Sequence, residues 1–210
     1  MPLLLASTSP RRKDLLALLR IPFEVADPSF VERLRRDLTP EEQAKQFAAG
    51  KARSCAAQHP TRLVLGSDTL IALDGSVLGK PADLAEARAM LRTLRGREHL
   101  IHTAVALCRQ DEPGEAIGCE TVRVWMKPFS EQELTAYLAT GEGLDKAGAY
   151  SIQGRGGDLI ERILGDYTAA VGLPLRLTAE LLRKAGLAVP ADVAELYRTK
   201  PYPNWGTFEG

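Results

Sequence analysis

The sequence has few cysteines and histidines, and their spacing excludes several kinds of site. Its three cysteines, Cys55, Cys108 and Cys119, are odd in number and far apart, and they form no CxxC or Cys/His ligand pattern. This argues against a disulfide framework and against a structural zinc site, and it fits a reducing compartment. The three histidines show no triad or metal spacing with a nucleophile. Ser/His and Cys/His hydrolysis are therefore not indicated.

The chain also lacks net charge and long apolar runs. Its 210 residues contain 27 Lys and Arg against 27 Asp and Glu, so no overall field attracts nucleic acid or anionic lipid, and any cationic site must be local. No stretch approaches the roughly 20 apolar residues of a membrane span, and the N-terminus has no signal-peptide pattern. We therefore expect a cytoplasmic protein that binds neither nucleic acid nor membrane.

An alternation of short apolar runs and capped helical segments indicates one α/β domain over residues 1–188. Residues 39–42, Thr-Pro-Glu-Glu, form a capping box with proline at the first helical position. Two long strands, 99–109 and 117–126, are expected to form a hairpin across the polar loop 110–114. We predict a mixed twisted sheet flanked by helices.

The last 22 residues, 189–210, contain three prolines and scattered aromatic residues. This composition is typical of an appended tail. The tail either docks through Tyr202 and Trp205 or stays mobile.

The first twelve residues combine an apolar strand with a polar helix start. Leu3-Leu4-Leu5-Ala6 leads to Ser7, Ser9, Arg11 and Arg12, and Ser9 has the place of an N-cap, with proline after it. The unpaired N–H groups of this helix end point to the same space as the serines and arginines, which favours an anion site, most plausibly for phosphate. An ordinary βα turn with two solvated arginines is the alternative.

Asp68 follows a short apolar run, residues 63–66, and we expect it just past the carboxyl end of a buried strand, where α/β proteins place reactive groups. Its carboxylate could bind a divalent metal or act as a general base for water. The alternative is an Asp that caps a turn. An aspartyl-phosphate phosphohydrolase would need a second Asp two residues later, where Leu70 stands.

Two lysines are candidates for phosphate contacts. Lys80 follows the hairpin signal Asp74-Gly75, which can return it to the neighbourhood of Asp68. Lys51 lies on the apolar stripe of its helix, where either a snorkelling side chain or a phosphate contact would explain it. For Lys80, an ordinary surface turn is the alternative.

The segment 143–157 is rich in glycine and polar residues yet contains Tyr150 and Ile152. Small residues let backbone approach a flat ligand, and Gln153 offers a donor and an acceptor to a base edge. A binding loop is favoured over a flexible loop.

Together these segments resemble the Maf family of nucleoside triphosphate pyrophosphatases, which is related in fold to the inosine triphosphate pyrophosphatases (Ham1). The motifs that carry the resemblance follow the family order from residue 3 to about residue 186: they are Leu5-Ala6-Ser7-Thr8-Ser9-Pro10-Arg11-Arg12, Lys51, Gly66-Ser67-Asp68-Thr69, Leu78-Gly79-Lys80-Pro81, Asp145-Lys146-Ala147-Gly148-Ala149-Tyr150 with Ile152-Gln153-Gly154, and Gly165-Asp166-Tyr167 with Val171-Gly172-Leu173-Pro174. The tail lies outside it. The implied fold is a two-lobed domain with the site in the cleft.

The resemblance implies hydrolysis of a nucleoside triphosphate to the monophosphate and pyrophosphate with a divalent cation, Mg²⁺ or Mn²⁺. It implies that Asp68 is the proton acceptor or metal-linked base and that Lys80 acts with it. The residues that would bind substrate are Ser7, Ser9, Arg11, Arg12, Lys51, Thr69, Lys146 and Gln153. Where the family often has an acidic cluster after the first helix, only Glu32 stands, so Asp68 and Glu32 are the implied metal ligands.

The Asp-Lys-Ala-Gly-Ala-Tyr segment with a nearby Gln looks like the family branch that acts on dTTP and UTP. Arg12, Thr69 and Gln153 correspond to the positions associated with that preference. Two alternatives stay open: the same reaction on another base, such as 7-methyl-GTP, and a nucleotide-binding regulator of septum formation with little turnover. The resemblance is also consistent with a homodimer.

Overall fold

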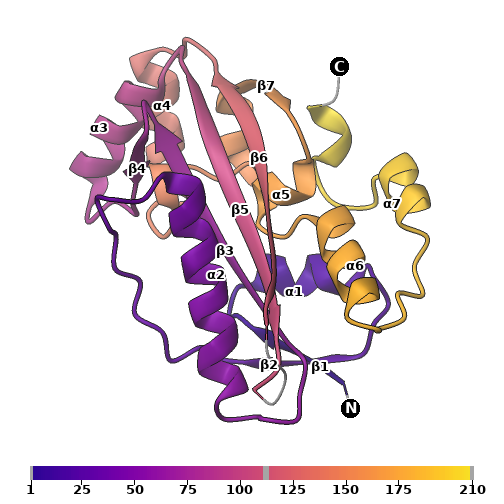
Figure 1. The fold of residues 1–210 in the computed structure, drawn as a ribbon. Coiled ribbons are helices and arrows are strands. Elements are labelled where there is room, and N and C mark those ends of the chain that lie inside the picture. The colour runs from indigo at the N-terminus through magenta and orange to yellow at the C-terminus, as the bar shows by residue number, and fades with distance from the viewer. Residues whose placement is uncertain (1, 111–113, 209–210) are drawn as a thin grey trace.

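A computed structural model describes residues 2–110 and 114–208, and a mixed sheet forms its centre (Figure 1). The strands lie in the order β2-β1-β3-β5-β6-β7, and β4 pairs with the end of β3. β1 is parallel to β2 and β3, whereas the other pairs are antiparallel. The strands are β1 (Leu3–Ala6), β2 (Phe23–Ala26), β3 (Val64–Leu73), β4 (Ser76–Leu78), β5 (Glu98–Cys108), β6 (Ala116–Met126) and β7 (Ile160–Leu164).

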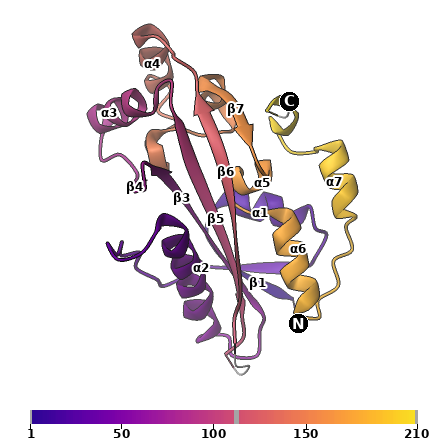
Figure 2. The same ribbon diagram turned by 45° about the horizontal axis from the view of Figure 1, so that its top comes forward.

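Helices cover both faces of the sheet, which confirms the predicted α/β class (Figure 2). Buried side chains of α2 pack against one face, and those of α1, α3, α4, α5 and α6 belong to the larger core cluster on the other. The α-helices are α1 (Pro10–Ala17), α2 (Pro40–Ala56), α3 (Leu84–Leu94), α4 (Glu131–Leu138), α5 (Tyr167–Val171), α6 (Leu175–Lys184) and α7 (Val193–Thr199). Short 3₁₀ turns are η1 (Ala147–Ala149), η2 (Gly154–Leu159) and η3 (Trp205–Thr207).

Local signals in the sequence explain where several elements begin and turn. Thr39 and Glu42 form the predicted capping box of α2, because the Thr39 side chain accepts from the Glu42 N–H and the Glu42 carboxylate accepts from the Thr39 N–H. Asp74 and Gly75 have φ angles of 50° and 78°, as a two-residue hairpin between β3 and β4 requires. The predicted β5–β6 hairpin is also confirmed. Of its loop, residues 111–113 lie outside the described residues.

The sequence predicts a strand that ends at Gly66 and a strand pattern that resumes at residues 70–73. The interruption is wrong, because β3 runs unbroken from Val64 to Leu73, and the resumed pattern is confirmed. β5 pairs with β3 from Val64 to Ala72, so a continuous ladder along this edge holds the strand beyond Gly66. β1, in contrast, pairs with β3 only as far as Gly66. Asp68 therefore lies in the middle of a strand rather than past its end, but it lies beyond the carboxyl end of the neighbouring β1.

The C-terminal tail is folded against the domain rather than extended. Trp205 is fully buried, and its ring stacks on that of Tyr167 with 6.0 Å between ring centroids. The sequence allowed either a docked or a mobile tail, and the structure has the docked one. The proposed boundary between residues 188 and 189 stays a prediction.

Within the described ranges, no helix combines the length and the apolar character needed to cross a membrane. The longest, α2, has 17 residues and carries several charged side chains.

His99 is a buried histidine in the core, and its Nε2 shares a hydrogen bond of 2.7 Å with the Tyr150 hydroxyl. Burial lowers the pKa of His99 from 6.5 to about 4, so the folded protein keeps it neutral. Between these pH values the unfolded chain binds a proton that the folded chain does not. The free energy of unfolding should therefore fall by about 3 kcal/mol as the pH drops from 6.5 to 4.

Urea denaturation between pH 4 and pH 7 measures this loss. His99→Gln should remove most of it, whereas His59→Gln, at a more exposed histidine, should not. An equal pH dependence in His99→Gln and the unaltered protein would contradict the assignment.

Candidate active site

The turn between β1 and α1 gathers the predicted serines with Arg12. Ser9 is the N-cap residue of α1, as predicted, but its side chain makes no capping hydrogen bond. Instead, the Ser9 N–H donates to Ser7 Oγ over 3.2 Å, and Arg12 Nη1 donates to the same oxygen over 3.4 Å. Arg11 and Arg12, in the first turn of α1, lie at the positive end of the helix.

Arg12 joins three elements through its guanidinium group. Nε donates to the Gly172 carbonyl oxygen over 3.0 Å, and Nη2 donates to Thr69 Oγ1 over 3.2 Å. Gly172 has a φ of 131°, a conformation that favours glycine. Ser67 Oγ donates to the same carbonyl over 3.1 Å. The planar fork of Arg12 thus links α1, β3 and the turn after α5.

Thr103 and the Gly172 carbonyl are parts of the site that the sequence did not indicate. Thr103 Oγ1 lies 3.0 Å from Thr69 Oγ1 and donates to the Ala169 carbonyl over 2.8 Å. In the sequence, Thr103 is one residue of an apolar strand pattern, which carries no signal of this contact. Gly172 belongs to a family motif, but a backbone carbonyl gives no residue-type signal.

A buried lysine holds two carboxylates on the other face of β3. Lys51 Nζ lies 2.5 Å from Asp68 Oδ1 and 2.6 Å from Glu32 Oε1. The Asp68 side chain is 5% exposed and that of Lys51 11%, whereas that of Glu32 is 48% exposed. Lys51 therefore does not reach past the apolar stripe into solvent. Its ammonium group is enclosed against Asp68.

The electrostatics of Asp68 suit a proton acceptor. Burial raises the pKa of its carboxyl group above the ordinary value, and the nearby Glu32 raises it further, while Lys51 and Arg12 act in the opposite direction. Asp68 Oδ2 is buried and accepts no hydrogen bond from any described residue. A buried carboxylate oxygen without a partner is costly, so it marks a place where a ligand or water would bind.

Two glycines allow the approach of Lys51 and Glu32. A Cβ atom on Gly66 would lie 2.2 Å from the Ala48 carbonyl oxygen, so only glycine lets α2 pack this closely on β3. A Cβ atom on Gly50 would meet the ring of Phe30 at 2.2 Å. Phe30 thereby fastens the segment after β2 to α2, two residues before Glu32.

Lys80 and Lys146 lie outside this hydrogen-bonded cluster. The β3–β4 hairpin pairs Leu78 with Ile71 and so returns the chain toward Asp68, yet Lys80 is exposed and forms no ion pair with a described residue. Lys146 Nζ lies 2.5 Å from Asp145 Oδ1, within its own loop. Their roles toward a substrate stay predictions.

The glycine-rich segment is a folded loop rather than a flexible one. Tyr150 and Ile152 are buried in the core, so they do not face a ligand. The Gly148 N–H donates to the Gly79 carbonyl over 3.0 Å, which fastens the loop to the hairpin before Lys80. Gln153 is half-buried and keeps a partly accessible side chain.

The residues present fit a magnesium-type cation that is shared with a substrate. The part of the chain that the structure describes has no group of three or more His, Cys, Asp or Glu side chains placed to hold a metal. Asp68 and Glu32 nevertheless converge on Lys51, and Asp68 Oδ2 is free to coordinate. Mg²⁺ is often bound by one or two carboxylates together with substrate phosphates.

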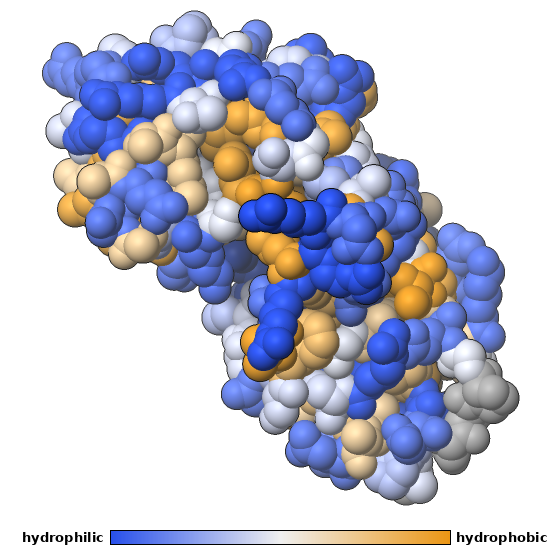
Figure 3. All heavy atoms as spheres, turned by 60° about the vertical axis from the view of Figure 1, so that its left-hand side comes forward, coloured by the Kyte–Doolittle hydropathy of each residue, from blue (hydrophilic) through white to orange (hydrophobic). Residues whose placement is uncertain are grey.

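A hollow of about 580 Å³ lies on the same side of the sheet as Asp68. Its lining includes Glu41 at the start of α2, Ala72 on β3, and Leu100 and His102 on β5. Figure 3 views this side and shows the outline narrowing between two lobes, with hydrophobic residues exposed at the narrow part.

A family model described as Maf-like protein matches residues 2–185, which is most of the chain. This chain therefore belongs to the Maf-like family, and the resemblance drawn from its motifs is confirmed. A dTTP/UTP pyrophosphatase of Symbiobacterium thermophilum is 46% identical over 187 residues, which cover 89% of this chain and 95% of that protein. A dTTP/UTP pyrophosphatase of Bacillus velezensis is 44% identical over 182 residues, 87% of this chain and 95% of that protein.

Among solved structures, the Staphylococcus aureus Ham1 protein has a TM-score of 0.43 and 17% sequence identity. The superposition covers 60% of this chain and 72% of that chain.

Gly66→Ala tests whether the close contact of α2 with β3 positions the site. The added methyl group must displace the backbone of α2, so we expect a loss of about 1–3 kcal/mol in the free energy of unfolding. Urea denaturation measures it. Gly206→Ala is the matched control, because a Cβ atom there meets nothing within 4 Å. Equal stability of the two variants would refute the tight contact.

Proposed function

We propose that this protein is a nucleoside triphosphate pyrophosphatase that hydrolyses dTTP and UTP to the monophosphate and pyrophosphate. The observation that carries the proposal is Asp68, a buried carboxylate with one oxygen on Lys51 and the other without a hydrogen-bond partner among the described residues. The relatives at 44% and 46% identity bear this activity in their names.

In this reaction Asp68 is the general base. Water attacks the α-phosphorus, the bond to the pyrophosphate oxygen breaks, and the proton of the water passes to the carboxylate of Asp68. Burial makes this carboxylate more basic, while the ammonium group of Lys51 keeps it ionised. The balance of the two effects suits a group that must be ionised before the attack and accept a proton during it.

The N-terminal end of α1 supplies the positive charge for the triphosphate. Arg11 and Arg12 lie in its first turn, and Ser7 and Ser9 precede it. Phosphoryl transfer depends mostly on positioning and electrostatic stabilisation, for which helix N–H groups and arginine forks are suited. Lys80 follows β4 with an exposed side chain and would contact the triphosphate from there.

A divalent cation, Mg²⁺ or Mn²⁺, would be held by Asp68 and Glu32 together with the triphosphate, and when bound it would neutralise charge on the leaving pyrophosphate. Lys51 pairs with both carboxylates and so keeps them side by side. The base would be read by Gln153 and Thr69. Thr69 Oγ1 already accepts from Arg12. It also lies 3.0 Å from Thr103 Oγ1, whose single hydroxyl hydrogen goes to the Ala169 carbonyl, so the Thr69 hydroxyl would have to turn away from Thr103 to donate to a base.

Two alternative functions stayed open from the sequence, a regulator with little turnover and the same reaction on another base, and neither gains separate support. An orphaned buried carboxylate oxygen suits turnover better than binding alone, which disfavours a regulator without activity. A preference for 7-methyl-GTP would not fit the names of the relatives. The cytoplasmic location and the homodimer stay predictions.

Asp68→Asn should abolish turnover and retain nucleotide binding, because the amide keeps the shape of the carboxylate and loses its basicity. The rate of pyrophosphate release from UTP should fall by about 100-fold to 10,000-fold or more. Asp158→Asn, at an exposed aspartate, should keep the unaltered rate. Normal turnover by Asp68→Asn would remove Asp68 from the mechanism and with it the proposal.

Lys80→Ala and Arg12→Ala should each lower kcat/KM for every triphosphate. The factor should correspond to a loss of about 1.5–3 kcal/mol in transition-state stabilisation. Lys80 is exposed, so its variant should keep the melting temperature. Arg12→Ala should lower it too, because the Gly172 and Thr69 contacts are lost. Lys184→Ala, on the exposed face of α6, is the control. Unchanged kinetics in Lys80→Ala would show that the hairpin does not bring it to the substrate.

A further inference from the structure

The C-terminal tail lies beyond the part of the chain that matches the family model, yet it packs on the core. The match ends at residue 185, and helix α7 begins at Val193. Tyr197, on α7, meets the buried Trp205 ring edge-on with 4.9 Å between ring centroids. The guanidinium group of Arg176 lies 3.8 Å from the centroid of the Tyr197 ring. These contacts hold the ring, so they also set the position of its hydroxyl group.

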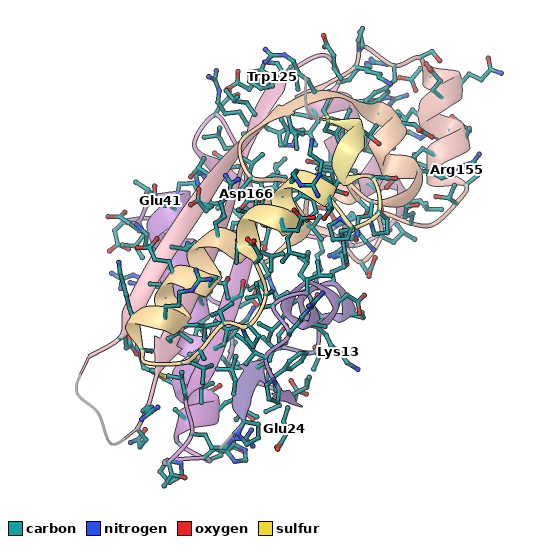
Figure 4. All side chains as sticks on the ribbon, turned by 90° about the vertical axis from the view of Figure 1, so that its right-hand side faces the viewer. Lys13, Glu24, Glu41, Trp125, Arg155 and Asp166 are labelled. Atoms are coloured by element: carbon teal, nitrogen blue, oxygen red, sulfur yellow. The ribbon has the colours of Figure 1, made fainter. Side chains whose placement is uncertain are left out.

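The Tyr197 hydroxyl bridges the starts of two helices. It donates to Asp166 Oδ2 over 2.6 Å, and Asp166 is the N-cap residue of α5. The same hydroxyl oxygen accepts from the backbone N–H of Arg176, in the first turn of α6, over 3.3 Å. Figure 4 shows Asp166 beside the C-terminal segment, which is drawn in yellow. One side chain of the tail thus joins the start of α5 to the start of α6.

Helix α6 takes its capping groups from outside because its own N-cap residue is a proline. Pro174 makes no side-chain capping hydrogen bond, and the first N–H groups of a helix have no partner within the helix. Thr168 Oγ1 accepts from the Leu175 N–H over 3.0 Å. The Tyr197 hydroxyl accepts from the next N–H along the helix. Two hydroxyl groups therefore cap α6, and one of them belongs to the tail.

The turn between α5 and α6 carries the carbonyl group that holds Arg12. The Gly172 N–H donates to the Thr168 carbonyl over 3.1 Å. The Gly172 carbonyl accepts from Arg12 Nε over 3.0 Å. Helix α5 ends one residue before Gly172, and α6 begins three residues after it. A hydroxyl group that joins the starts of both helices therefore restrains the turn between them and the direction of this carbonyl.

Arg12 keeps donors for a phosphate after it has bound the protein. Its Nε donates to Gly172, and one N–H each of Nη1 and Nη2 is directed to Ser7 and Thr69. Each terminal nitrogen carries a second N–H, which is what the guanidinium group offers to an anion. The direction of these donors follows from the plane of the group, and the Gly172 carbonyl helps to set that plane.

We propose that Tyr197 is a positioning residue for phosphate binding, whose hydroxyl restrains the turn at Gly172 and thereby orients Arg12 toward the triphosphate. This inference rests on the role of Arg12 in the proposed function. An arginine that the protein already holds loses less rotational freedom when an anion binds. Because the restraint concerns the phosphates and not the base, its effect is the same for every nucleoside triphosphate.

Tyr197→Phe keeps the ring, with its packing on Trp205 and Arg176, and removes only the hydroxyl. We expect kcat/KM for UTP, dTTP and CTP to fall by one common factor of about twofold to tenfold, the fold-change that corresponds to one hydrogen bond. Pyrophosphate release from each nucleotide measures it. Unchanged values for all three nucleotides, or a loss confined to one base, would overturn the inference.

A double-mutant cycle with Arg12→Ala tests whether Tyr197 acts through Arg12. Once Arg12 is an alanine, no guanidinium group is left to orient, so the added Tyr197→Phe change should leave kcat/KM where it is. If the two losses multiply in the double variant instead, Tyr197 acts by another route and the inference fails.

Tyr167→Phe is the matched control, because it makes the same chemical change at a second tyrosine that fastens the tail. The Tyr167 hydroxyl donates to the Pro203 carbonyl over 2.6 Å. Its removal loosens the tail but leaves the Tyr197 contacts with Asp166 and Arg176 in place. We expect a lower melting temperature and unchanged kcat/KM. A loss of kcat/KM as large as that in Tyr197→Phe would mean that loosening of the tail explains both effects, against the inference.

Calorimetric titration with pyrophosphate separates this inference from the proposed function. Pyrophosphate is the leaving group of the proposed reaction and carries no base. If the unaltered protein binds pyrophosphate but releases none from UTP or dTTP, the proposed function fails, and the Kd for pyrophosphate still decides the role of Tyr197. A Kd about twofold to tenfold higher in Tyr197→Phe than in the unaltered protein and in Tyr167→Phe supports the inference. An equal Kd in all three proteins, or no binding by the unaltered protein, overturns it.

Discussion

The buried ion pair between Lys51 and Asp68 is the interaction on which the arrangement of the site depends. Moving both charges out of water is expensive, and their attraction compensates only when the geometry is close. That closeness requires α2 to pack onto β3 where Gly66 offers no side chain. It also requires the segment after β2 to deliver Glu32, which the packing of Phe30 on α2 achieves. The packing of α2 on β3 and of the segment after β2 on α2 thus positions the three charged side chains of Lys51, Asp68 and Glu32.

Such a cluster is a poor way to stabilise a fold, because apolar side chains of similar volume are often as good or better. Here the cost is higher still, since Asp68 Oδ2 is left without a partner. Arg12, by contrast, is fully engaged on the opposite face through Gly172 and Thr69. The site therefore combines a rigid cation with a carboxylate that is held ready, which is an arrangement suited to binding an anion and moving a proton.

Local sequence signals predicted the fold well where the deciding residues are close together. The Thr39–Glu42 capping box and the Asp74-Gly75 turn act within four residues, and both were confirmed. The unbroken course of β3 through residues 67–69 was not predictable, because it is decided by pairing with β5, a distant strand. In the site, residue types indicated Asp68 and Arg12. The contact of Thr103 with Thr69 depends on the register between β3 and β5, and residue types alone do not indicate that register.

The two faces of β3 separate the Lys51–Asp68 ion pair from the C-terminal tail. Asp68 and its partner Lys51 lie toward α2, whereas the tail packs on the side of α1 and α5. On that second side the tail contacts the glycine-rich loop at Gly157 without entering the charge cluster. Its anchors are groups the domain already has, such as the carboxylate of Asp166, which caps α5 whether or not Tyr197 binds it. The aromatic anchors of the tail and the Lys51–Asp68 ion pair therefore share no contact, because β3 lies between them.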